Sequence, residues 1–243
     1  MPTIPSTIPF IRRNELHPIL EQAFSGCERY ICILIAIENH QAISSFCGER
    51  TRTELVEQMF IRFENRLKPT YRLFQISDNK LVCVAPIDSD TADDVIQIVD
   101  GCFSKPIVCE NSPMIWLSRM GGASVFPDDA QDGAALLSCA ESALQYAQKQ
   151  GGSRIQRFSH QIREHTNRFQ LVYQRLCSAI EMNTIDLWFQ PMYDPFSKQV
   201  TICEALARWH DEILGVVSPD EFILVAEVSG LIKPLSEKLF SNL

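Results

Sequence analysis

A carboxylate and a guanidinium stand four residues apart in an otherwise apolar stretch near the end of the sequence. In TICEALARW, side-chain alternation places Ile202, Glu204, Leu206 and Arg208 on one face of a predicted strand. Glu204 and Arg208 lie about 13 Å apart along an extended strand that rises ~3.3 Å per residue, so they do not pair with each other. Each needs its own partner. A neighbouring Lys or Arg usually satisfies an isolated glutamate, whereas a local arginine can hold a small anionic ligand.

Two further carboxylates lie at the ends of predicted strands in the first half of the chain. Asp78 belongs to SDN, a compact turn between YRLFQI and KLVCVA, and this pattern predicts a β-hairpin. Glu38 ends YICILIAIE, which is apolar on both faces, as in a strand at the centre of a covered sheet. For both carboxylates we favour the interpretation that they are solvated surface groups.

The elements that position these residues alternate between strand and helix periods. Strands are predicted at 30–38, 71–76, 80–85, 114–126 and 154–158, and helices at 55–67, 91–103 and 134–150. The order β-α-β-β-α-β with additions predicts a sheet with helices on one face. The Gly121–Gly122 pair indicates an irregularity within its strand.

A linking helix is predicted from His160 to Met182. Its apolar stripe consists of Ile162, Phe169, Val172, Leu176 and Ile180. After it, LWFQPM and QVTICEALARW are predicted strands separated by the turn YDPFSK. SPDEFILVAEVSG is a predicted helix with Ser218 as N-cap and Gly230 at its C-terminal end.

The stretch from Leu187 to Ile232 resembles the opening of an EAL domain, the barrel of cyclic-di-GMP phosphodiesterases. It contains that family's Phe-Gln-Pro strand, Glu-Ala-Leu-x-Arg-Trp strand, Gly-x-x-x-Pro loop and Phe-Ile-x-x-Ala-Glu helix, in that order. The resemblance implies roles for four residues. Glu204 would be a ligand of Mg²⁺ or Mn²⁺, Leu206 and Arg208 would contact the ligand, and Gln190 would contact the dinucleotide.

SRMGGASVFPDDAQDGAALLSCAESALQYAQKQGGSRIQRF resembles the C-terminal end of a GGDEF domain, the diguanylate cyclase fold. The family pattern there is Ser-x-Gly-x-Ala-x-x-Pro, followed by a helix with Ala-Asp-x-Ala-Leu-x-x-Ala-Lys-x-x-Gly. A GGDEF domain followed by an EAL domain is a familiar tandem, so each resemblance supports the other.

The residues of the cyclase site depart from the family pattern. The signature hairpin becomes Ser77, Asp78, Asn79, Lys80 and Leu81, so that a cation replaces a metal-binding acid. The metal aspartate of the first strand falls on Ala36, and the guanine-binding positions fall on Ser44 and Thr53. The inhibitory Arg-x-x-Asp motif reads KPTY at 68–71. Because two-metal phosphoryl chemistry needs carboxylates, the resemblance implies a degenerate cyclase domain.

These observations predict an α/β (α+β) chain in three parts. They are a GGDEF palm-type, ferredoxin-like domain at 1–159, a linking helix at 160–185, and the first elements of an EAL barrel at 186–243. A TIM-like barrel needs on the order of 250 residues, so we expect about a quarter of a phosphodiesterase site, cut from a longer protein or left by a truncated gene.

Three functions stay open at this point. The favoured one is a cyclic-di-GMP signalling protein whose inactive GGDEF domain regulates the EAL domain. The second is a fragment of an active phosphodiesterase that needs Mg²⁺ or Mn²⁺ once its barrel is complete and forms linear pGpG. The third is a protein-interaction module that binds no nucleotide. Because the first strands of a barrel have uncovered edges, we also expect the segment after about Asp186 to pack against the linking helix or a second copy of the chain, or to exchange strands with it. A protein partner or a homodimer is therefore expected.

Bulk properties exclude several other classes. The net charge of −8, without a run of Lys or Arg, argues against nucleic acid and anionic membranes as partners. Nine cysteines without a CxxC motif are expected to be reduced thiols that fill the core. No signal pattern precedes the first domain and no apolar stretch reaches ~18 residues, so a cytoplasmic location is expected.

Overall fold

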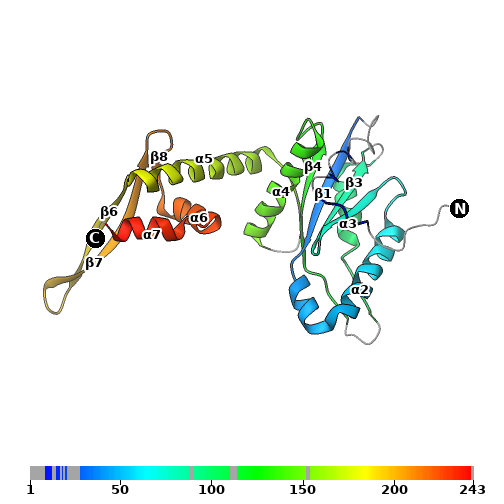
Figure 1. Cartoon of the computed structure of the whole chain (residues 1–243), viewed down its shortest axis with the longest axis horizontal. Helices are drawn as coiled ribbons and strands as arrows, with labels where there is room; N and C mark the ends of the chain where they lie inside the picture. Colours follow the sequence, from blue (N-terminus) through cyan, green and yellow to red (C-terminus); the bar gives the residue numbers. More distant parts are fainter. Residues whose placement is uncertain are drawn as a thin grey trace. The chain divides into compact units, whose positions relative to one another are not determined.

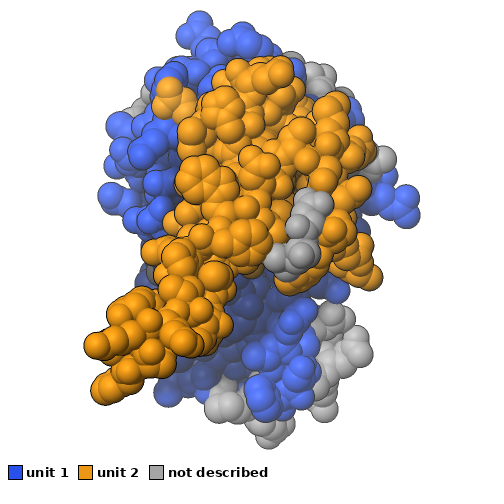
Figure 2. Space-filling model, turned by 90° about the vertical axis from the view of Figure 1, so that its left-hand side faces the viewer, with its two compact units in different colours: residues 1–163 blue, residues 164–243 orange. Residues whose placement is uncertain are grey.

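The chain forms two compact units, residues 1–163 and 164–243, which Figure 2 colours separately. The computed structural model describes residues 9–12, 15, 16, 18, 20, 28–87, 90–109, 114–151 and 154–241, without the side chains of 47–50, 52 and 53. Each unit has its own hydrophobic core. The boundary between the units falls inside the predicted linking helix, four residues after the predicted end of the first domain at 159.

A five-stranded sheet forms the centre of the first unit (Figure 1). Its strands are β1 (Tyr30–Ile37), β2 (Arg72–Ser77), β3 (Lys80–Pro86), β4 (Arg119–Phe126) and β5 (Ile155–Arg157). They lie in the order β2-β3-β1-β4-β5, and every neighbouring pair is antiparallel except β4 and β5. The predicted order of strands and helices is confirmed, including the hairpin of β2 and β3.

Helices cover both faces of this sheet, so the prediction of helices on one face was wrong. α2 (His40–Arg66) and α3 (Ala92–Gly101) pack on one face, and α4 (Gly133–Gln150) packs on the other. The odd-numbered residues of β1 join the core with α2 and α3, and the even-numbered residues join the core with α4. A strand that is apolar on both faces requires cover on both sides. None of the described helices is long and apolar enough to cross a membrane.

The Gly121–Gly122 pair permits close packing of α4 on β4. A Cβ atom on Gly122 would lie 1.9 Å from the carbonyl oxygen of Ala140 and 2.3 Å from the amide nitrogen of Leu144. No side chain fits there without moving the helix backbone. The predicted irregularity is therefore a contact surface, and β4 runs through the pair without interruption.

The cysteines contribute to both cores of the first unit. The seven cysteines whose side chains are described form no disulfide, and Cys32, Cys83, Cys102 and Cys109 are buried. Burial, with a smaller contribution from Glu141, raises the pKa of Cys32 to about 12. These buried thiols behave as small apolar side chains, as the sequence predicts.

The second unit contains a three-stranded antiparallel sheet and three helical segments. α5 (His160–Met182) leads into β6 (Ile185–Asp194), β7 (Gln199–Asp211) and β8 (Gly215–Val217), followed by α6 (Pro219–Ser229) and α7 (Ile232–Phe240). The sheet order is β6-β7-β8, and the described strands do not close into a barrel. Ser218 caps α6 by accepting the amide of Glu221, and Gly230 ends it with φ of 77°, both as predicted.

The core of the second unit joins α5 to the later elements. Val172 and Leu176 of α5 share one cluster of buried residues with Trp209 and Phe222, whose rings meet edge to face at 5.7 Å. The expected packing of the last segment against the linking helix is therefore confirmed. The end of β6 and the start of β7, which the hairpin turn connects, extend beyond α6 and α7 (Figure 1) and are largely exposed.

Candidate functional site

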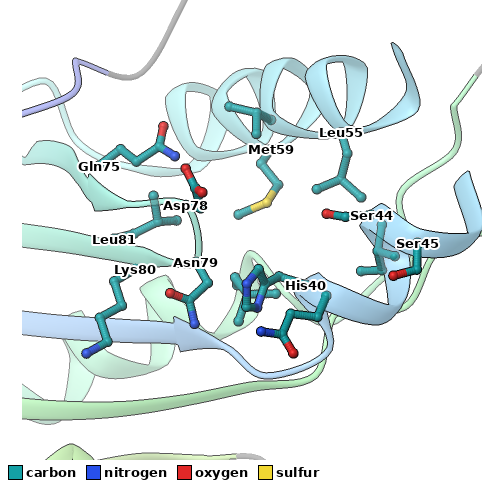
Figure 3. A pocket seen from close by; sticks show the side chains of 14 residues that line it. His40, Ser44, Ser45, Leu55, Met59, Gln75, Asp78, Asn79, Lys80 and Leu81 are labelled. Carbon is teal, nitrogen blue, oxygen red and sulfur yellow. The ribbon is translucent and has the colours of Figure 1, made fainter. Parts of the chain in front are cut away.

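A cavity of about 460 Å³ lies beside the β2–β3 hairpin of the first unit (Figure 3). The first turns of α2, a later turn of the same helix and the hairpin turn surround it. Ile43, Leu55 and Met59 provide apolar lining, and Figure 3 shows Leu55 and Met59 pointing into the space. A volume in this range suits a small molecule.

Most of the predicted cyclase positions meet at this cavity. Its lining includes Ser44, Asp78, Asn79, Lys80 and Leu81. Ser77 lies next to them, and its hydroxyl donates a hydrogen bond to Oδ1 of Asn79 over 3.1 Å. Thr53 lies in α2, and its side chain is outside the described part of the structure. Positions that the resemblance assigns to the cyclase site are therefore close together in the fold, although they are distant in the sequence.

Ala36 and Lys80 are direct cross-strand neighbours in the ladder of β1 and β3. Ala36 is buried in the core that faces α4, and the amide of Ile37 donates to the carbonyl of Asn79 over 2.8 Å. A methyl group and an ammonium thus stand where the resemblance places metal-binding acids. Among the described residues, no group of three His, Cys, Asp or Glu side chains could hold a metal ion. The described residues of the cavity therefore do not fit a two-metal centre.

His40 and Asn39, at the start of α2, were not singled out by sequence reasoning. Asn39 holds the N-cap position without a side-chain cap, because its amide donates to Trp116 O (2.8 Å) and its Oδ1 accepts from Ser118 N (3.0 Å). His40 lines the cavity, and its Nδ1 atom is buried without a hydrogen-bond partner. A single His after a strand carries no sequence signal for this arrangement.

Glu38, the carboxylate that follows β1, makes a surface hydrogen bond. Glu38 is exposed and accepts a hydrogen bond from Gln148 Nε2 over 2.9 Å. This geometry is consistent with the solvated surface group expected from the sequence, although its partner is an amide.

The segment aligned with the inhibitory motif is engaged in internal contacts. Lys68 forms an ion pair with Asp90, and the hydroxyl of Tyr71 donates to the same carboxylate over 3.2 Å. Burial, followed by the charge of Asp90 and the hydrogen bond to it, raises the pKa of Tyr71 to about 12. The cation and the hydroxyl at these two positions are thus paired with a carboxylate of the same unit.

In the second unit, the four EAL-like positions lie on one face of the β6–β7 hairpin. Gln190 pairs directly with Glu204, and the neighbouring pair on the same face is Trp188 with Leu206. Arg208 follows one pair further along and donates from Nη1 to the carbonyl of Ala207 over 2.9 Å. The side-chain alternation read from the sequence therefore matches the register of the hairpin.

This face supplies only part of a metal site. Gln190 and Glu204 are exposed, and the described residues add no further carboxylate, His or Cys to form a group of three around Glu204. Mg²⁺ prefers six oxygen ligands, of which proteins usually supply one or two carboxylates. Glu204 fits one such ligand, and the described residues do not build the rest of the site.

Comparison with known proteins identifies the parts of the chain. Residues 173–243 match the EAL domain family. The oxygen sensor protein DosP of Escherichia coli is 30% identical over 224 residues, which cover 91% of this chain and 27% of DosP. The cyclic di-GMP phosphodiesterase NbdA of Pseudomonas aeruginosa is 22% identical over 206 residues, covering 84% of this chain and 26% of NbdA. The chain thus spans about a quarter of these two relatives.

The fold of the first unit also has solved counterparts. The GGDEF domain of TpbB (YfiN) from P. aeruginosa superposes with a TM-score of 0.59 at 16% identity, covering 68% of this chain and 98% of that domain. At this identity the likeness shows the fold alone. Together, the matches give a tandem architecture, in which a GGDEF-type fold precedes a segment of an EAL domain.

Proposed function

We propose that this GGDEF–EAL chain is part of a cyclic-di-GMP signalling protein, in which the GGDEF-type unit is a regulatory module that makes no cyclic-di-GMP. The observation that carries the proposal is the cross-strand pairing of Ala36 with Lys80 beside the hairpin turn. Formation of a phosphodiester from GTP develops negative charge, which metal ions held by carboxylates normally neutralise. An alanine and a lysine at these positions cannot hold such ions.

The relatives support the signalling context. NbdA is named a cyclic di-GMP phosphodiesterase, and it matches across both units of this chain. Cyclic-di-GMP is therefore the ligand that we propose for the wider protein, with a cytoplasmic location. The exposed apolar residues of the β6–β7 hairpin, among them Trp188 and Phe196, also favour a protein partner or a second copy of the chain.

The test of the regulatory role is the absence of cyclase activity. The chain is incubated with GTP and Mn²⁺, and the nucleotides are separated by chromatography beside a heat-denatured sample. We expect no cyclic-di-GMP above that control. Product that accumulates with time and enzyme concentration would show that another set of ligands replaces the missing acids, and the proposal would be abandoned.

A second candidate function rests on the face that carries Gln190, Glu204, Leu206 and Arg208. In an EAL phosphodiesterase completed by further strands, Glu204 would hold Mg²⁺ or Mn²⁺, and the other three would contact the dinucleotide. Residues 1–243 alone contribute one carboxylate to this arrangement, so we expect no metal-dependent conversion of cyclic-di-GMP to pGpG. Hydrolysis that Glu204→Ala abolishes would instead favour the phosphodiesterase over the regulatory module.

A further inference from the structure

The cavity beside the hairpin has the surface chemistry of a site for an uncharged ring rather than for a triphosphate. Met59, Leu55 and Ile43 supply apolar lining, and a methionine sulfur is well suited to contact an aromatic ring. Among the described lining residues the one cation is Lys80, and its side chain points away from the middle of the cavity (Figure 3). Asp78 stands at the same rim and opposes the binding of an anion.

Eight of the fourteen described lining residues are polar, and one of them, His40, has a nitrogen without a hydrogen-bond partner. Nδ1 of His40 is shielded from solvent and makes no hydrogen bond, which is costly for a buried polar atom. The ring of His40 is otherwise half-buried in the lining. A half-turn about its Cβ–Cγ bond exchanges Nδ1 with Cδ2 and Nε2 with Cε1, so the two ring orientations offer a ligand different nitrogen positions. The Ser44 hydroxyl lies across the same space (Figure 3).

We infer that this cavity binds a phosphate-free heteroaromatic molecule of one or two rings. Its ring system packs against Met59 and Leu55, and its ring nitrogen or N–H exchanges a hydrogen bond with His40. The inference rests on the proposed function, since it takes the cavity to be free of GTP chemistry, and it specifies what the regulatory module senses. Apolar walls combined with placed polar groups are the general pattern of small-molecule sites.

Benzimidazole is a suitable probe, because it carries both a donor and an acceptor nitrogen and so matches either tautomer of His40. Chains labelled with ¹³C at the methionine methyl groups are titrated with benzimidazole and followed by NMR. We expect a saturable shift of the Met59 signal, which is assigned with Met59→Leu. The Met192 signal should stay unchanged, because Met192 is exposed on β6 in the other unit.

Two comparisons isolate the hydrogen bond. Indene has nearly the same shape without a nitrogen, and it should bind the unaltered chain at least tenfold more weakly than benzimidazole. His40→Phe keeps an apolar ring and should weaken benzimidazole binding by tenfold or more, whereas the matched His210→Phe on β7 should have no effect. The indene comparison does not depend on a variant that folds.

Three results would overturn the inference. The first is that benzimidazole causes no saturable shift of the Met59 signal. The second is that indene and benzimidazole bind with equal affinity. The third is that GTP with Mg²⁺ shifts the Met59 signal and benzimidazole does not. None of these is a measurement of cyclase activity. Failure of the proposed function would appear as GTP turnover, so the two failures are distinguishable.

Discussion

Arg175 of α5 and Asp211 at the end of β7 form an ion pair in which Nε lies 2.7 Å from Oδ2, and only 5% of the Asp211 side chain is exposed. The other oxygen of Asp211 accepts the amides of Ile213 and Leu214 at 2.9 and 3.0 Å. One carboxylate thus connects the helix to the turn that leads into β8. Removing one member of a buried pair leaves the other uncompensated.

Asp211→Asn is therefore expected to lower the free energy of unfolding of the second unit by about 3 kcal/mol. Urea unfolding, followed by the fluorescence of the buried Trp209, measures this loss. The control is Arg168→Gln, which breaks the more exposed pair with Glu221 and should cost below about 1 kcal/mol. Equal losses for the two variants would show that the burial of Asp211 has no energetic consequence.

The same carboxylate predicts an acid-sensitive second unit. Burial acts to raise the pKa of Asp211, but hydrogen bonds from Leu214, Ile213 and Arg175 outweigh it and hold the pKa below the ordinary aspartate value. A lowered pKa in the folded state stabilises the fold above the ordinary value of about 3.9, and this contribution is lost as the pH falls through the lowered pKa. The stability difference between the unaltered chain and Asp211→Asn should therefore be constant near neutrality and shrink below about pH 4. A difference that grows on acidification contradicts this assignment.

The ion pair also shows what the sequence could not predict. Arg175 and Asp211 are 36 positions apart in the chain, and their contact depends on how α5 packs beside β7. The register of β6 and β7 was predictable, because strand alternation alone places Gln190, Glu204, Leu206 and Arg208 on one face. The ends of α5 were also predictable from its apolar stripe.

In the first unit, too, some features were predictable from the sequence and others were not. The apolar pattern of β1 indicates a central strand covered on both sides, and the hairpin turn follows from its SDN sequence. The cavity beside the hairpin was not predictable, since it depends on the packing of two parts of α2 against a turn. The buried nitrogen of His40 became visible only once its surroundings were known.

The close contact at Gly122 predicts a severe effect of a single methyl group. Gly122→Ala places a Cβ 1.9 Å from Ala140 O, so α4 must move away from β4, at a cost of about 3 kcal/mol. Gly121→Ala is the matched control. Its Cβ would lie 2.9 Å from Cγ1 of Ile155 and 3.0 Å from Leu34 O, so the overlap is smaller than at Gly122. In thermal unfolding followed by circular dichroism, Gly122→Ala should have a much lower melting temperature than Gly121→Ala. The reverse order would contradict the close contact at Gly122.

The pairing of Ala36 with Lys80 makes a final prediction about the two positions that the resemblance aligns with metal-binding acids. Directly opposed residues on neighbouring strands have Cβ atoms about 5 Å apart, close enough for charges to interact. Ala36→Asp should be partly tolerated in the unaltered chain, because Lys80 supplies the opposite charge to a carboxylate buried beside it. In Ala36→Asp with Lys80→Glu, two carboxylates face each other, and the loss of stability should exceed the sum of the single variants by about 1–2 kcal/mol. Mn²⁺ should reverse much of this extra stability loss in the double variant, since a divalent cation bridges opposed carboxylates, whereas EDTA should abolish the effect of Mn²⁺.

Thermal unfolding of the three variants with Mn²⁺ or EDTA measures the coupling between the two positions. Additive losses that do not respond to Mn²⁺ would mean that the two side chains do not face a common point.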